Sequence, residues 1–389
     1  MNDIIVDLYN IQVSNDFIED IIKNNSYNQQ IIEYYKRLEK EYTKYSYEQY
    51  KIEDDDLSQD IFRINEDKIY NFQSKIDSID NCNKLWQMDR YELQKIKDFK
   101  KTNLCKDKFC NNCKKVKQAS RMSQFIPHLQ ELEKDFDLFH VVLTVPNVEG
   151  HNVKDLRDTI KNMFLSYRRL NRYLQHIETI KGMDFYEFGY VGSLRSLEVS
   201  FNNDTYHPHL HCIFIMKKGL KLNKKYVNQY SFDKYKKKKL RKFSYFELLL
   251  QKMWYLLNNK KRITKKNIEE LETGYSCMVD EIQEEHYFEV FKYMTKSNNE
   301  KNEFLSYDNF KVLYFGLRSV RQIQGFGILY RLKEIDNENE VEEKYNEIIS
   351  YLQKNESPLE VFEAPTDLLK DNEYLVISRK KIYSYLKTL

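Results

Sequence analysis

His207-Pro208-His209-Leu210-His211, followed at once by the apolar run Cys212–Met216, is the stretch from which the fold of this chain can be worked out. Three of the eight histidines lie within these five residues, and the apolar run predicts a buried β-strand. Side chains alternate between the two faces of a strand, so the three histidines share one face. Two imidazoles on one face can bind a divalent metal ion. Such a pair also occurs by chance, so the neighbouring segments decide what it means.

The residues upstream predict the partner of this strand. Ser196–Phe201 has the pattern of a second strand, and the turn-prone Asn202-Asn203-Asp204 that follows it is typical of a β-hairpin. If the turn has an even number of residues, Glu198 lies opposite His209 on the same face, whereas a shift of one residue moves it to the other face. Two histidines and one carboxylate would hold Mg²⁺ or Mn²⁺ and leave positions open for a phosphate. His207 is the alternative third ligand.

The remaining patterns predict an α+β protein. A β-rich run, His140–Val145, is stopped by Pro146, and a strand-like run near the end contains Gly325-Phe326-Gly327. Helical patterns cover 153–180, 245–258 and 286–297. We expect a polar helical region over 1–75, a cysteine-rich segment over 76–125, a main domain over 126–332 and a charged helical tail over 333–389. These patterns alone fit several α+β folds.

Four cysteines gather within the cysteine-rich segment. They are Cys82, Cys105, Cys110 and Cys113. Two cysteines separated by two residues are typical of half a zinc knuckle, and Cys82 could complete a four-thiolate site. Lysines follow directly, as in many small nucleic-acid-binding zinc modules. Reduced thiols without a metal are the alternative.

Glu289 and Tyr293 lie four residues apart in a helical pattern, so they share one face of the expected helix. A tyrosine hydroxyl can attack a phosphodiester, and a carboxylate one turn away could later activate water. Lys292 and Lys296 would add positive charge beside them. The same spacing recurs elsewhere in this chain, which is rich in tyrosine and glutamate, so the spacing alone indicates only an ordinary tyrosine.

Positive charge is concentrated between Lys217 and Lys242, which we call the basic segment. It contains twelve Lys or Arg and one acid, Asp233, although the whole chain has a net charge of only +3. Its densest run is Lys236, Lys237, Lys238 and Lys239. Lysines attract phosphates, and the interleaved tyrosines can stack on unpaired bases. A solvated lysine-rich loop is the alternative.

The composition predicts a protein without membrane spans. Hydrophobic residues make up 41% of the chain and charged residues 32%, and no stretch approaches 18 consecutive apolar residues. The first residues show no basic region followed by an apolar core, so no signal peptide is expected. These features predict a cytoplasmic protein without a membrane partner, in which cysteines are thiols or metal ligands.

The order of these segments resembles the replication initiators of small rolling-circle plasmids, and more narrowly the single-tyrosine Rep family within the HUH endonucleases. The segments similar to that family's motifs are Leu104–Cys113, Val142–Val148, Leu197–Ser200 with His207–His211, Glu289–Lys296 and Arg321–Ile328. The resemblance extends from about 80 to 332. Two features depart from the family. The cysteine motif has Asn111 and Lys114-Lys115 where a proline and paired arginines are expected, and the basic segment is an addition to the core.

The resemblance implies an HUH-type fold, with the histidine strand in the middle of an antiparallel sheet and the tyrosine helix crossing it. It also implies an enzyme that binds a plasmid origin at a hairpin or single-stranded nick site. Tyr293 would attack the scissile phosphate and keep the 5′ end, while the freed 3′-OH primes synthesis by a host DNA polymerase, with a host helicase as a further partner. His209, His211 and Glu198 would hold the metal ion, and Glu289 would activate water at termination.

Three alternatives remain open. Another HUH enzyme, a transposase or a relaxase, shares the metal and tyrosine chemistry, but the cysteine motif and the segment around Tyr293 favour an initiator. A zinc-containing DNA-binding regulator without nuclease activity would explain the cysteines and the basic segment, but not the histidine hairpin. Metal-dependent covalent attachment to DNA separates it from the enzymes. An inactive relative is disfavoured because the motif residues are intact.

Overall fold

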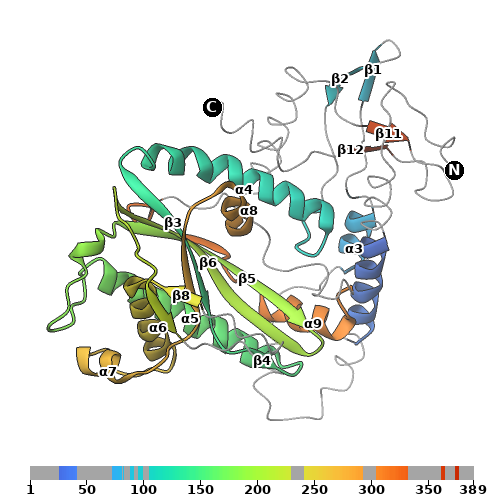
Figure 1. Ribbon diagram of the computed structural model, residues 1–389. Coiled ribbons are helices and arrows are strands. Elements are labelled where there is room, and N and C mark those ends of the chain that lie inside the picture. The colour runs from blue at the N-terminus through green and yellow to red at the C-terminus, as the bar shows by residue number, and fades with distance from the viewer. Residues whose placement is uncertain are drawn as a thin grey trace, which may run out of the picture. The chain divides into compact units, whose positions relative to one another are not determined.

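The computed structural model of the chain describes residues 26–41, 72–80, 82, 88–91, 95–99, 105–228, 241–291, 304–331, 361–363 and 373–375 (Figure 1). The chain forms two compact units, and each is made of separate stretches of sequence. The first unit comprises Met1–Pro127, Ser297–Lys311 and Ile335–Leu389. The second unit comprises His128–Lys296 and Val312–Glu334, and it contains the histidine strand.

A six-stranded sheet forms the centre of the second unit. Its strands, in the order in which they pair, are β10 (Ile323–Gly327), β5 (Gly192–Asn202), β6 (Thr205–Lys217), β3 (Phe136–Thr144) and β9 (Cys277–Glu281), with the short β4 (Val148–Glu149) also on β6. Every pairing is antiparallel. The histidine strand is β6, and it lies in the middle of the sheet. The predicted α+β class, with an antiparallel sheet and flanking helices, is confirmed.

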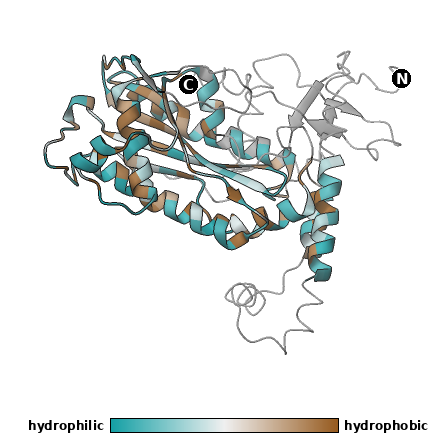
Figure 2. Ribbon diagram, turned by 60° about the horizontal axis from the view of Figure 1, so that its bottom comes forward, coloured by the Kyte–Doolittle hydropathy of each residue, from teal (hydrophilic) through white to brown (hydrophobic). Residues whose placement is uncertain are grey.

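Two helices cover one face of this sheet, α5 (Val153–Leu174) and α6 (Tyr245–Asn258). The hydroxyl of Tyr167 on α5 lies 2.7 Å from that of Ser193 on β5, and the Trp254 indole of α6 donates to the Thr144 carbonyl at 2.7 Å. The short helix α7 (Lys265–Glu270) follows α6. Figure 2 shows helices beside the sheet whose ribbons carry both teal and brown, as those of amphipathic helices do.

The helix α8 (Glu284–Phe291) contacts β5 and β6. Its His286 ring stacks on His140 of β3, with centroids 4.5 Å apart. His140 pairs with Ile213, an odd-numbered position of β6, so its side chain lies on the same face as the histidines of the motif. The helix that carries Glu289 therefore covers the histidine face, opposite α5 and α6.

Capping residues set the starts of the helices. Asn152 accepts from the backbone of Lys154 and Asp155 at the start of α5, and Ser244 and Glu247 form a capping box at the start of α6. The predicted helix over 153–180 ends early, at Leu174. The chain leaves the helix at His176, whose φ is +59°, in the left-handed region. The predicted helix over 286–297 is described as far as Phe291.

The first unit packs helices through aromatic rings. A helix over 26–41 and α3 (Phe72–Asp80) belong to it, while α4 (Asn111–Leu132) and α9 (Tyr307–Gly316) begin in it and end in the second unit. Phe310 lies 5.1 Å from the ring of Tyr35 and 4.8 Å from that of Phe109. The helix over 26–41 agrees with the helical pattern expected for the N-terminal region.

Three short hairpins complete the described elements. They are β1 (Met88–Tyr91) with β2 (Lys95–Phe99), β7 (Tyr226–Asn228) with β8 (Arg241–Phe243), and β11 (Val361–Glu363) with β12 (Glu373–Leu375). The last pair belongs to the tail for which a helix was expected. At these six residues the chain is strand instead, and each strand has an aromatic residue at its centre, a type that favours strands. In the described part of the chain, no helix has the length and apolar character needed to cross a membrane.

Candidate metal centre

The hairpin of β5 and β6 brings Glu198, His209 and His211 together. Asn202 pairs with Thr205, so the turn has two residues, and Glu198 lies directly opposite His209 as predicted for an even turn. The Nε2 atoms of His209 and His211 lie 3.2 and 3.1 Å from Oε2 of Glu198. One potential ligand atom from each of the three side chains lies within 4.8 Å of the others. The expected hairpin and its register are confirmed.

The hydrogen bonds of His209 define which ring atom faces the carboxylate. Its Nδ1 lies 3.0 Å from the carbonyl oxygen of His207, and a carbonyl can only accept, so Nδ1 carries a proton. In the neutral ring Nε2 then has a lone pair, which faces the Glu198 oxygen at 3.2 Å. A proton on this nitrogen or a metal ion between the two atoms makes the contact favourable, and the distance fits either. The side chain of Glu198 is only 2% exposed, so water cannot provide that compensation easily.

The three side chains fit a divalent cation. Ligand atoms at about 2.1 Å from an octahedral ion lie about 3 Å apart when they are adjacent, which matches the 3.1 and 3.2 Å separations. Two imidazoles and one carboxylate bind Mn²⁺ and other transition metals well, whereas Mg²⁺ prefers oxygen. Three ligands would leave further positions for substrate oxygens. The structure thus holds a group of side chains that could bind a metal ion.

His207, the alternative ligand, lies outside this group. It is exposed, and its ring centroid lies 6.3 Å from that of His209. Its carbonyl oxygen is what orients His209. Any role as a ligand stays a prediction.

Two further histidines adjoin the group and were missed in the sequence. His140 Nε2 lies 3.1 Å from His211 Nδ1, and the ring of His286 stacks on that of His140. His140 begins the β-rich run noted above, but only its pairing with β6 brings it beside His211. Finding His140 in the sequence would have required the register between β3 and β6, and sequence patterns alone do not give it.

The expected nucleophile lies outside the described residues, as do Lys292, Lys296 and the run Lys236–Lys239. Glu289, its expected partner, is on α8 and half-buried. Because α8 contacts β5 and β6, Glu289 is on the helix that covers the candidate metal ligands. The roles of Tyr293 and Glu289 stay predictions.

The four cysteines of the first unit come together. The Sγ atom of Cys113 lies 3.4 Å from those of Cys82 and Cys105, and the Sγ atoms of Cys110 and Cys82 are 3.5 Å apart. Four thiolates bound to one Zn²⁺ at about 2.3 Å lie about 3.8 Å from one another. The cluster is therefore close to the size of a tetrahedral zinc site. The prediction that these four cysteines come together is confirmed, and the bound metal stays a prediction.

Hydrogen bonding within the cluster favours a thiolate at Cys110. Burial raises the pKa of the Cys110 thiol, but hydrogen bonds from the other three cysteines outweigh burial and lower the pKa well below its ordinary value. The hydrogen bond with Cys110 is the main cause that raises the pKa of Cys105, and the hydrogen bond with Cys105 is the main cause that raises the pKa of Cys113. The Asn28 amide also donates to Cys110 Sγ at 3.4 Å. Thiolate is the form that binds zinc.

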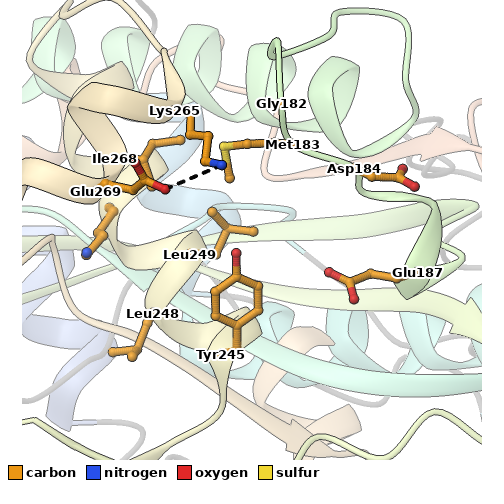
Figure 3. Close-up of a pocket in the computed structure, with 11 residues that line it drawn as sticks. Gly182, Met183, Asp184, Glu187, Tyr245, Leu248, Leu249, Lys265, Ile268 and Glu269 are labelled. Carbon is orange, nitrogen blue, oxygen red and sulfur yellow. Dashed lines mark ion pairs between the residues drawn. The ribbon is translucent and has the colours of Figure 1, made fainter.

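A separate cavity of about 490 Å³ lies beside α6 and α7 (Figure 3). The ring of Tyr245 stands in the middle of its lining, with Asp184 and Glu187 on one side and the Lys265–Glu269 ion pair on the other. Burial, and then the charge of Glu187, raises the pKa of Tyr245. Its lining includes none of the candidate metal ligands, so the candidate centre is the histidine group and not this cavity.

Comparison with known proteins gives a match to a family model and a match to a curated relative. A family model described as a replication protein matches residues 96–364 of the chain. A curated relative, "Protein rep" from Staphylococcus aureus, is 28% identical over 159 residues, which cover 40% of this chain and 63% of the relative. No solved structure matches the chain.

Proposed function

Because the chain belongs to the Rep_1 family of replication proteins, we propose that it initiates plasmid replication by nicking one strand of the origin. The curated relative supports this reading, although the match spans only 63% of that relative's length. The family match favours an initiator over a transposase or a relaxase. The proposed substrate is origin DNA at a hairpin or single-stranded nick site.

The observation that carries the proposal is the convergence of His209 Nε2 and His211 Nε2 on Oε2 of the buried Glu198, at 3.2 and 3.1 Å, which is the spacing of three ligands around one divalent cation. His209, His211 and Glu198 would hold Mg²⁺ or Mn²⁺. The bound ion would polarise the scissile phosphate and offset the charge that develops on it. The central position of β6 and the crossing of α8 over the same face support an HUH-type arrangement.

Tyr293 would supply the nucleophile for this reaction. Its oxygen forms a bond to phosphorus, the bond from phosphorus to the 3′ oxygen breaks, and the leaving 3′ oxygen takes up a proton in place of the one that the tyrosine hydroxyl gives to solvent. The 5′ end stays on the enzyme as a phosphotyrosine, and the 3′-OH is free to prime synthesis. The covalent bond conserves the energy of the phosphodiester for rejoining. At termination Glu289 would accept a proton from water, which then hydrolyses the phosphotyrosine.

Other residues would bind rather than react. Lys292, Lys296 and the basic segment, with Lys236–Lys239, would contact phosphates of the DNA. The cysteine cluster would hold a structural Zn²⁺ and stabilise the first unit. A host helicase and a host DNA polymerase would extend the primer.

The test needs no knowledge of the origin. The protein is incubated with randomised single-stranded DNA and Mn²⁺, denatured, and searched for DNA-modified peptides by mass spectrometry. An adduct on Tyr293 that is absent without Mn²⁺ is the expected result. Tyr293→Phe should remove it, and the matched change Tyr330→Phe, at a tyrosine 70% exposed, should not.

Two outcomes would overturn the proposal in different ways. An adduct on another tyrosine would keep the reaction and reject Tyr293. DNA binding with no adduct in any form of the protein, tested also with the cognate plasmid, would instead indicate a DNA-binding regulator without nuclease activity.

A further inference from the structure

Three imidazoles form a continuous row on the histidine face of the sheet. His140 and His211 lie nearly parallel, with an interplanar angle of 7°, and His140 Nε2 is 3.1 Å from His211 Nδ1. His286 stacks on His140 at a centroid distance of 4.5 Å and an angle of 23°. The row joins three elements: β6, β3 and α8. It therefore connects a candidate metal ligand to the helix that carries Glu289.

The position of His140 follows from the sheet. Residue 140 pairs with 213 and residue 142 with 211, so His140 is two positions along β3 from the residue opposite His211. His140 is only 6% exposed. Because the ring is buried, its nitrogen atoms need hydrogen-bond partners within the protein.

The Nδ1 proton of His211 supplies one such partner. For Nε2 of His211 to bind a metal beside Glu198, the proton of the neutral ring must be on Nδ1, and Nδ1 then needs an acceptor. The Nε2 atom of His140 is at hydrogen-bonding distance for that role. The His207 carbonyl serves His209 in the same way. The Nδ1 atom of each histidine in the candidate centre thus has its own potential acceptor, the Nε2 atom of His140 for His211 and the His207 carbonyl for His209.

We propose that His140 is a positioning residue, which accepts the Nδ1 proton of His211 and so directs its Nε2 at the metal ion. His286 holds the His140 ring in place from α8 and ties that helix to the centre. This inference rests on the metal centre of the proposed function. It assigns to two residues outside the ligand set a share in metal affinity and in the placement of α8.

Two substitutions separate hydrogen bonding from packing. His140→Phe keeps a ring for His286 to stack on but removes the acceptor, whereas His140→Gln keeps an acceptor and removes the ring. His128→Gln, at an exposed histidine of α4, is the control. The affinity of each full-length protein for Mn²⁺ is measured by titration followed by electron paramagnetic resonance, and folding is checked by circular dichroism.

The expected result is a loss of Mn²⁺ affinity of about 10- to 100-fold in His140→Phe, the size typical of a lost outer-shell partner. His140→Gln should stay within a few-fold of the natural protein, as should His128→Gln. If His140→Phe and His140→Gln lose the same Mn²⁺ affinity, His140 serves packing and not hydrogen bonding. If His140→Phe loses no Mn²⁺ affinity, the inference is rejected. If the natural protein itself binds no Mn²⁺, the proposed metal centre fails, which is a separate result.

His286 is tested by its effect on rate. His286→Phe keeps the stack and His286→Ala removes it. With the DNA recovered from the randomised pool, His286→Ala should lower the nicking rate at saturating Mn²⁺ by about tenfold or more, while Mn²⁺ affinity changes little and His286→Phe restores the rate. Equal rates for the Ala and Phe forms would reject the tie between α8 and the centre.

Discussion

At the scale of single residues, the candidate centre places one buried acidic side chain against two imidazole rings. Glu198 is buried, and its Oε2 atom lies 3.2 and 3.1 Å from the Nε2 atoms of two imidazoles. Such a group is costly without a cation and favourable with one. Metal binding and the stability of the second unit should therefore be linked.

Glu198→Gln tests that linkage. The amide has the same shape and can donate to His209 Nε2, so the metal-free protein should melt at the same temperature or higher. Mn²⁺ at about 100 times its Kd should stabilise the natural protein by about 2.7 kcal/mol, and this effect should disappear in the variant. Thermal melts with and without Mn²⁺ measure both. Glu149→Gln, at an exposed glutamate of β4, should retain the shift, and a shift retained by Glu198→Gln would exclude Glu198 as a ligand.

Glu289→Gln addresses the end of the reaction. If this carboxylate only activates water, the first nick should proceed at close to its natural rate. Release of the DNA from Tyr293 should slow by about 10²-fold or more, the usual contribution of a general base. Denaturing gels that follow the covalent complex over time measure both steps. Release at the natural rate would remove Glu289 from the mechanism.

At the scale of elements, local signals and long-range signals differ in what they could predict. The hairpin of β5 and β6 was predictable because its turn residues are adjacent in sequence and fix the register. The capping box at Ser244 likewise marks the start of α6 where the helical pattern begins. The place of His140 was not predictable, because it depends on the register between β3 and β6, some 70 residues apart in sequence.

The end of α5 shows a signal that sequence reading misses. No glycine or proline stops the helix at Leu174. Glu178 turns back to form ion pairs with Arg169 and Arg172, at 3.3 and 2.7 Å, and its backbone N–H donates to the Arg172 carbonyl. The helix therefore ends through contacts of residues that come after it, which periodicity cannot reveal.

The capping box of α6 gives a prediction at this scale. Ser244→Ala should lower the free energy of unfolding of the second unit by about 1 kcal/mol. Glu247→Ala should cost more, because Glu247 also accepts from the buried N–H of Val279 at 3.0 Å. Thr264→Ala, at the cap of the shorter α7, is the matched control and should cost less. Urea unfolding is followed by tryptophan fluorescence. All variants carry Trp86→Phe, so that Trp254 is the one remaining tryptophan. Equal costs at Ser244 and Thr264 would contradict the role of the box.

At the scale of the whole molecule, the described residues include two candidate metal sites of different chemistry, one in each unit. Thiolates favour Zn²⁺, whereas a mixed imidazole and carboxylate group would accept Mn²⁺. The cysteine grouping was predictable from spacing, since Cys110 and Cys113 are separated by one short turn. Cys82 joins them from 28 residues before Cys110, through the fold of the first unit.

Metal content tests this division. The purified protein should contain about one Zn²⁺ per chain by atomic emission, as one four-thiolate site holds one ion. Cys110→Ser should lose that zinc and lower the melting temperature, yet keep Mn²⁺ binding by the histidine group. Cys277→Ala, at a buried cysteine of β9 outside the cluster, should keep the zinc. Zinc at natural levels in Cys110→Ser would show that the cluster is not its site.

The two units are built from alternating stretches of one chain, and this has a consequence for inheritance and for engineering. Neither unit is encoded by one continuous stretch of the gene. One cut after Lys296 would sever Ser297–Lys311, and with it Phe310, from the rings of Tyr35 and Phe109. Recombination between related plasmids should therefore exchange the two units together, and chimaeras joined at one crossover within this region should fail to fold.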